Sequence, residues 1–261
     1  MKITYHNPGF SYSVDSILLF NNENASPFWM EPLLYFYPKL DREMLAQSNA
    51  SQKRQYLTDI LSPIYTKAEM EIEGKVSSYQ AHFALHQKQI EDAFSQAFGL
   101  NSQLLFSDLQ ANITLNPICP RFLQERRFDV FYKSSPRGAL GLSLHESIHY
   151  FWFYVWNKHF GDSYDEYEQP SLKWILSEMV VESIMVDPRL SSINPYFPRE
   201  NGGCVYPYFF NMIVDGQPIL ETLDRMYRQN PITDFMEQAY QYCLLHENTI
   251  RCHILKSERA I

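Results

Sequence analysis

The segment from Leu140 to Asn157 constrains the fold most, because it is apolar enough for a buried helix yet carries several ionisable side chains. Its central stretch reads "GLSLHESIHYFWF". The preceding "SSPRG" supplies turn and helix-start residues, so we expect a helix to begin there. Burying ionisable groups is costly unless they have partners. The chain must therefore fold so that other groups meet this helix in its core.

Two histidines of this segment have the spacing of a metal site. His145 and His149 are four residues apart, so on a helix their side chains lie on one face, one turn apart. Two imidazoles placed in this way can both reach one Zn²⁺ at about 2.0–2.1 Å. Glu146 then lies beside the metal and can act as a general base on water, which is the HExxH arrangement. The alternative is a buried helix whose histidines are satisfied by ordinary hydrogen bonds.

A catalytic zinc also needs a third protein ligand and an open position. The sequence "SEMVVES" places Glu178 and Glu182 four residues apart on the next expected helix, which covers residues 171–185. These two carboxylates lie among apolar residues, and a metal with its ligands would offset the cost of burying them. The alternative is a half-exposed helix edge with two solvated carboxylates.

Taken together, the two motifs resemble the gluzincin zinc metallopeptidases, the thermolysin-like group, over residues 145–182. The resemblance implies that His145, His149 and Glu178 bind Zn²⁺ and that Glu146 acts on the water. It places Glu182 where the family usually has an aspartate that hydrogen-bonds a ligand histidine and fixes its orientation. Glutamate in place of aspartate is a departure from the family pattern.

The resemblance also implies a donor that stabilises the oxyanion of the reaction, a tyrosine or histidine from the C-terminal part of the chain. The candidates are Tyr206, Tyr208, His246 and His253. The tyrosines rank first, because the flexible Gly202-Gly203 pair precedes them in a loop that could border a cleft.

The remaining pattern predicts the fold class. Helical periodicity fills much of the first hundred residues, with one helix ending at Pro63 and another ending at Gly99. Strand character follows at Ile113–Ile118 and at Phe128–Lys133. These strands could hold an extended peptide at a sheet edge, or they could only support the core. Helices before and after a small strand region favour an α+β, predominantly helical fold.

The family resemblance adds detail to this fold class. It implies a zincin-like catalytic core with a small sheet, an HExxH helix and a following glutamate helix. The chain would then be a single metallopeptidase-like unit over residues 1–261. We expect a helical N-terminal lobe at 1–105, the zinc core at 106–190 and a helical C-terminal lobe at 191–261.

Composition excludes some classes of function. The 45% hydrophobic and 20% charged residues are typical of a globular protein. A formal net charge of -8 and a pI near 5.5 give no support for nucleic-acid or polyanion binding, which needs a basic surface. No apolar run approaches the roughly 20 residues needed to span a membrane. The start lacks the apolar core of a signal peptide, and the four cysteines form no CxxC pair, so we expect reduced thiols and a cytoplasmic location.

Two hypotheses of function remain. The first is a zinc-dependent hydrolase of peptide bonds that acts on a peptide or protein substrate with a metal-activated water. The second is a catalytically inactive, metallopeptidase-like module that binds metal or a partner. Metal content combined with activity against peptides distinguishes the two.

Overall fold

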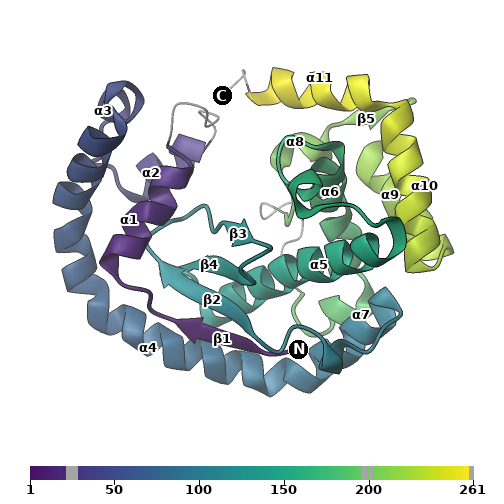
Figure 1. The fold of residues 1–261 in the computed structure, drawn as a ribbon, viewed down its shortest axis with the longest axis horizontal. Coiled ribbons are helices and arrows are strands. Elements are labelled where there is room, and N and C mark those ends of the chain that lie inside the picture. Colours follow the sequence, from purple (N-terminus) through teal and green to yellow (C-terminus); the bar gives the residue numbers. More distant parts are fainter. Residues whose placement is uncertain (22–28, 196–198, 200–202, 259–261) are drawn as a thin grey trace. The chain divides into compact units, whose positions relative to one another are not determined.

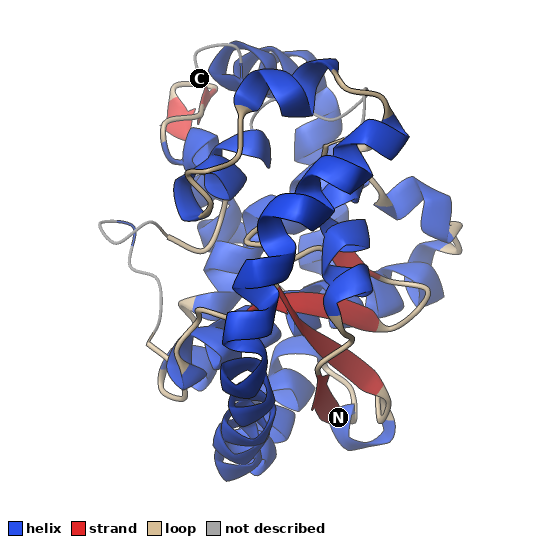
Figure 2. Ribbon diagram, turned by 90° about the vertical axis from the view of Figure 1, so that its left-hand side faces the viewer, coloured by secondary structure: helices blue, strands red, loops and turns tan. Residues whose placement is uncertain are grey.

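The computed structural model describes residues 1–21, 29–195, 199 and 203–258. The described α-helices are α1 (Phe10–Leu19), α2 (Met30–Phe36), α3 (Arg42–Gln47), α4 (Ala50–Phe98), α5 (Pro136–Phe160), α6 (Leu172–Met185), α7 (Pro188–Ser191), α8 (Pro207–Phe210), α9 (Ile219–Gln229), α10 (Ile232–Leu245) and α11 (Glu247–Glu258) (Figure 1). The described strands are β1 (Ile3–His6), β2 (Leu109–Thr114), β3 (Arg121–Phe122), β4 (Arg127–Phe131), β5 (Ile213–Val214) and β6 (Gln217–Pro218). Helices therefore predominate over strands, which confirms the α+β, predominantly helical class (Figure 2).

The described chain forms two compact units. The first combines residue 1 with residues 86–107 and 141–261, and the second combines residues 2–85 and 108–140. Each unit joins stretches that are distant in the sequence, and the division into three consecutive lobes stays a prediction. The HExxH motif and the glutamate helix both lie in the first unit, whereas the larger sheet lies in the second.

The sheet of the second unit has the strand order β1-β2-β4-β3. β1 pairs with β2 and β2 pairs with β4 in parallel, whereas β3 is antiparallel to β4. Strands β2 and β4 are almost entirely buried, although their sequences, LQANIT and RFDVF, alternate apolar and polar residues. The two predicted strands are confirmed with shifted bounds. β2 stops at Thr114, because Asn116 Oδ1 accepts a hydrogen bond from Ile118 N at 3.0 Å and turns the chain.

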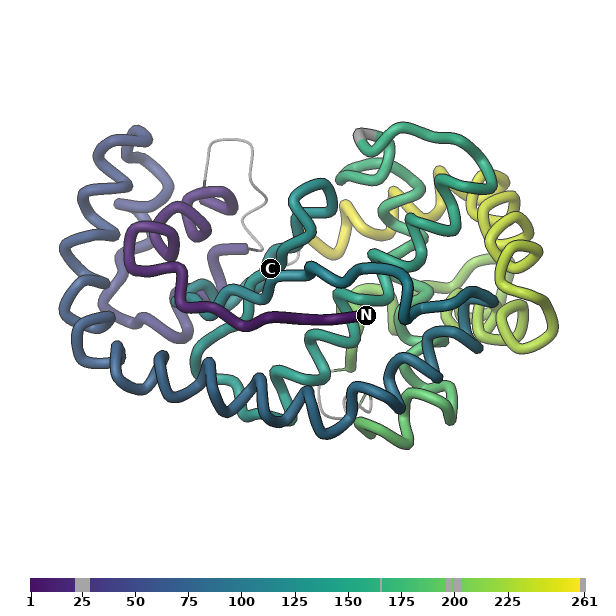
Figure 3. Tube along the Cα trace, turned by 60° about the horizontal axis from the view of Figure 1, so that its bottom comes forward, coloured from purple at the N-terminus to yellow at the C-terminus, as the bar shows by residue number. Residues whose placement is uncertain are grey.

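Strand β1 was not predicted. Figure 3 shows the N-terminal segment running alongside β2, and the register of the pair begins with Ile3 opposite Leu109. Four residues carry too little periodicity to be recognised alone, so this strand depends on a partner that lies far along the chain.

Buried hydrogen bonds join α1 to this sheet. The carboxylate of Asp129 on β4 accepts hydrogen bonds from Tyr12 Oη at 2.8 Å and from Ser16 Oγ at 2.5 Å. Tyr12 Oη also accepts from Asn112 Nδ2 on β2 at 3.1 Å. Burial raises the pKa of Asp129 to about 6, against the lowering effect of these donors. The network satisfies a fully buried carboxyl and holds α1 on the two central strands.

Helix α4 corrects one prediction, because it does not end at Pro63 but continues through it to Phe98. A proline inside a helix costs about 3 kcal/mol through the lost hydrogen bond and a clash. Burial of the apolar stripe on both sides of the proline offsets that cost, at about 1.5–3 kcal/mol for each large apolar side chain. The buried residues of this stripe around the proline are Leu57, Leu61, Tyr65, Ala68 and Ile72. The predicted end at Gly99 is confirmed by its left-handed φ of 62° directly after the last helical residue.

The C-terminal part of the first unit is helical, with one small hairpin that was not predicted. β5 and β6 are antiparallel and are joined by Asp215 and Gly216, whose φ angles of 53° and 71° fit a type I′ turn. Among the described residues, no helix is both long and apolar enough to cross a membrane.

Candidate metal centre

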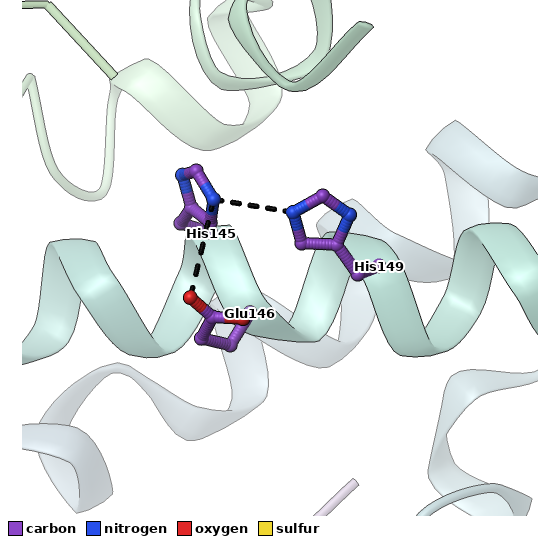
Figure 4. Close-up of side chains that lie close together, drawn as sticks. All are labelled: His145, Glu146 and His149. Carbon is purple, nitrogen blue, oxygen red and sulfur yellow. Dashed lines mark hydrogen bonds and ion pairs between the residues drawn. The ribbon is translucent and has the colours of Figure 1, made fainter. Parts of the chain in front are cut away.

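The start of α5 sets the position of the two motif histidines. Ser135 Oγ accepts a hydrogen bond from Gly138 N at 3.0 Å, and Pro136 takes the first helical position. Both features are typical of a helix N-terminus. The helix therefore covers the predicted segment, and His145 and His149 stand on the same side of it, one turn apart (Figure 4).

The loop between α5 and α6 fixes how the two helices meet. Asp162 Oδ2 accepts a hydrogen bond from Trp156 Nε1 on α5 at 2.7 Å and forms an ion pair with Lys173 Nζ on α6 at 2.6 Å. One carboxylate thus joins the last turns of α5 to the first turn of α6. This junction brings Glu178, in the middle of α6, opposite His149.

The three predicted zinc ligands converge on one point. His145 Nε2 and His149 Nε2 are 3.1 Å apart, His149 Nε2 is 3.6 Å from Glu178 Oε1, and His145 Nε2 is 3.9 Å from Glu178 Oε2. Two atoms bound tetrahedrally to zinc at about 2.0–2.1 Å lie roughly 3.3 Å from each other. The exposed fractions of the side chains are 16% for His145, 0% for His149 and 7% for Glu178. Spacing, burial and the N₂O donor set therefore fit one zinc ion.

The same spacing also suits a metal-free arrangement. One neutral imidazole can donate an N–H to the other nitrogen at 3.1 Å, and a protonated histidine can pair with the Glu178 carboxylate. The two arrangements differ in one measurable respect, which is whether the purified protein contains metal.

Glu146 is buried beside the histidines. Its Oε1 lies 3.9 Å from His145 Nε2, and one ligand atom from each of His145, Glu146 and His149 lies within 4.8 Å of the others. By distance alone, Glu146 could therefore also be a metal ligand. Glu178 is the better third ligand, because it has one carboxylate oxygen opposite each imidazole. In Figure 4 Glu146 leaves α5 on a different side from the two rings, which suits a group that acts on a neighbouring water.

Glu182, one turn after Glu178, is held by an arginine. Arg199 Nε lies 3.0 Å from both Glu182 carboxylate oxygens, and Arg199 Nη2 donates to one of them as well. The predicted hydrogen bond from a ligand histidine to Glu182 stays a prediction. Sequence reasoning missed Arg199, although a carboxylate on an apolar helix indicates that a cation must come from elsewhere in the chain.

The two candidate tyrosines lie together in an aromatic cluster beside α6. The rings of Tyr206 and Tyr208 stack at 5.3 Å, and Tyr206 lies 5.9 Å from Trp174 of α6. Burial raises the pKa of the Tyr208 phenol, and the charge of Glu178 raises it further, so the phenol stays protonated at neutral pH. Tyr208 is therefore the preferred candidate donor, because its phenol interacts electrostatically with the Glu178 carboxylate.

The glycine pair that precedes these tyrosines was expected to be flexible. Gly203 has a φ of 66°, and a Cβ at this position would lie 2.3 Å from Cζ of Phe210. The backbone conformation therefore favours glycine here, and a Cβ would also require the Phe210 ring to shift. Gly202 lies outside the described residues.

The two histidine candidates make other contacts. His246 Nε2 lies 3.6 Å from Asp215 Oδ2 in the hairpin turn. His253 Nε2 lies 2.8 Å from the backbone carbonyl oxygen of Tyr208, which joins α11 to α8. His253 thus contacts the backbone of the preferred tyrosine, and its role as an oxyanion donor stays a prediction. The predicted strands belong to the second unit, and their role in holding a peptide stays a prediction.

Comparison of the chain with protein families, curated proteins and solved structures finds no match. The resemblance to the gluzincins accordingly rests on the residues of this centre alone.

Proposed function

We propose that this protein is a zinc-dependent hydrolase of peptide bonds, with a gluzincin-like centre and a peptide or protein substrate. One observation carries the proposal. Two histidine nitrogens and a glutamate carboxylate, all largely buried and brought together from two helices, have the separations of a three-ligand zinc site. A glutamate with the spacing of a general base lies beside them.

The residues have separate roles in this proposal. His145, His149 and Glu178 hold the metal, which supplies a Lewis acid and lowers the pKa of a water molecule toward ~7. Glu146 accepts a proton from the attacking water and returns it to the leaving amine. Tyr208 donates its O–H to the substrate carbonyl oxygen as negative charge develops there.

The role of Tyr208 predicts a clear difference between two conservative variants. Tyr208→Phe removes only the hydroxyl, and we expect kcat to fall by about 10²–10³-fold with a much smaller change in KM, because the donor acts on the transition state. Tyr206→Phe is the matched control, because it keeps the stacked rings and should change kcat little. Steady-state kinetics of both variants test the assignment, and a larger loss in Tyr206→Phe would exchange the roles.

Metal content is the first test of the proposal. We expect about one Zn²⁺ per chain in protein purified without chelators, and loss of that zinc in His149→Ala, because two remaining ligands hold zinc poorly. His86→Ala is the control, since His86 lies half-exposed on α4. Metal-free wild-type protein, or zinc retained by His149→Ala, would overturn the site. Bound zinc without hydrolysis of any peptide in a library would instead indicate an inactive metal-binding module.

A further inference from the structure

A second site is indicated by a hollow of about 680 Å³ in the second compact unit. Its wall is formed by α4, by the chain between α2 and α3, and by the residues after β4. Three exposed lysines stand around it, each from a different one of these segments. The residues that form the charged part of the wall are Lys39, Lys67, Lys133 and Glu71.

The three lysines have no carboxylate of their own. Within the part of the chain that the structure describes, Lys39, Lys67 and Lys133 make no ion pair. The one carboxylate of the wall, Glu71, lies 4.0 Å from Lys75 Nζ, outside this lysine group. Three positive charges therefore face one hollow whose lining carries a single carboxylate.

This arrangement is unexpected for the chain as a whole. The sequence has 22 Lys and Arg against 30 Asp and Glu, so carboxylates are abundant enough to pair with every lysine. Like charges gathered at one place repel each other, and the repulsion is relieved when an anion binds between them. The acidic net charge gave no reason to expect an anion site, because a net charge does not tell where on the surface the individual charges lie.

Part of the lining of the hollow is apolar. Ile60 and Ile64 line it from α4. Lys133 Nζ lies 5.7 Å from the ring centroid of Tyr132, which also lines the hollow, and 5.7 Å from that of Phe36. We propose that this hollow binds a small multivalent anion of the phosphate class, either free or esterified to a small apolar group.

Calorimetric titration with inorganic pyrophosphate and with phenyl phosphate tests the proposal at low ionic strength. We expect saturable binding that weakens with added salt. Lys39→Gln, Lys67→Gln and Lys133→Gln should each weaken it by about 3-fold, and the triple variant by about 30-fold. Tighter binding of phenyl phosphate would support an esterified ligand, and equal or tighter binding of pyrophosphate would support a free anion.

A charge-matched control separates this hollow from the general effect of charge. A second triple variant, Lys2→Gln, Lys88→Gln and Lys256→Gln, removes the same charge from exposed lysines that do not line the hollow. It should bind both probes as the wild type does. No saturable binding to the wild type, or equal weakening by the control variant, would overturn the proposal. Neither result bears on the zinc centre, which lies in the other unit.

Discussion

Glu146→Gln is expected to retain about one zinc per chain and the native fold while losing hydrolysis by about 10²–10⁴-fold. The amide has the shape of the carboxylate but cannot accept a proton from water. Glu146 is 5% exposed on the well-packed helix α5, so an isosteric change disturbs the core little. Elemental analysis and the rate of cleavage of one peptide substrate, measured on the same preparation, give both quantities.

The control for this experiment is Glu69→Gln, the same change at an exposed position of α4. It should alter neither zinc content nor rate. A Glu146→Gln protein that remains fully active on a substrate of the wild type would exclude Glu146 as the base. A variant that loses its zinc would instead make Glu146 a metal ligand, which its 3.9 Å distance from His145 Nε2 also permits.

Glu178→Ala should cause the greatest loss of zinc affinity on α6, with Glu182→Ala intermediate. Glu178 faces both histidine nitrogens, at 3.6 Å and 3.9 Å, and removing one of three ligands should largely abolish binding. Glu182 is held by Arg199 and would act on the metal only indirectly. Partners of this indirect kind typically contribute about 10–100-fold in affinity or activity.

Zinc titration against a competing chelator ranks these variants. Arg199→Gln is the matched control, because it removes the partner of Glu182 and leaves both carboxylates in place. An effect similar to that of Glu182→Ala would show that the ion pair, rather than a hydrogen bond to a histidine, supports the site. The reverse ranking of the two glutamates would exchange their roles, and no effect from either would leave α6 with a structural role only.

Short-range patterns in the sequence determined several elements. Ser135 caps α5 within the SSPRG stretch that predicted a helix start, and Ser171 caps α6, with its Oγ accepting from Trp174 N at 3.1 Å. The four-residue spacing of His145 and His149 needs only a helix to place them together. Such features depend on neighbours within a few residues, and so they can be predicted from one sequence.

Other features were decided by contacts between distant segments. Strand β1 forms because Ile3 lies opposite Leu109, and α4 continues through Pro63 because its apolar stripe is buried on both sides. The pairing of Glu182 with Arg199 joins a helix to a segment without regular periodicity. Local propensity says nothing about such partners, because the free energy comes from burial and charge pairing after the chain has folded.

The candidate metal centre was likewise predictable from the sequence in part, and determined by tertiary packing in part. The spacing of the motif residues, together with the resemblance to the gluzincins, predicted His145, His149 and Glu178 as one ligand set, and the structure brings these three side chains together. Only the tertiary structure placed α6 across from α5, through the contacts of Asp162. The tertiary structure also determines the lysine hollow, because its three lysines come from separate segments and meet only once the helices have packed. A sequence specifies which groups a helix carries, whereas packing between helices decides which groups meet and at what distance.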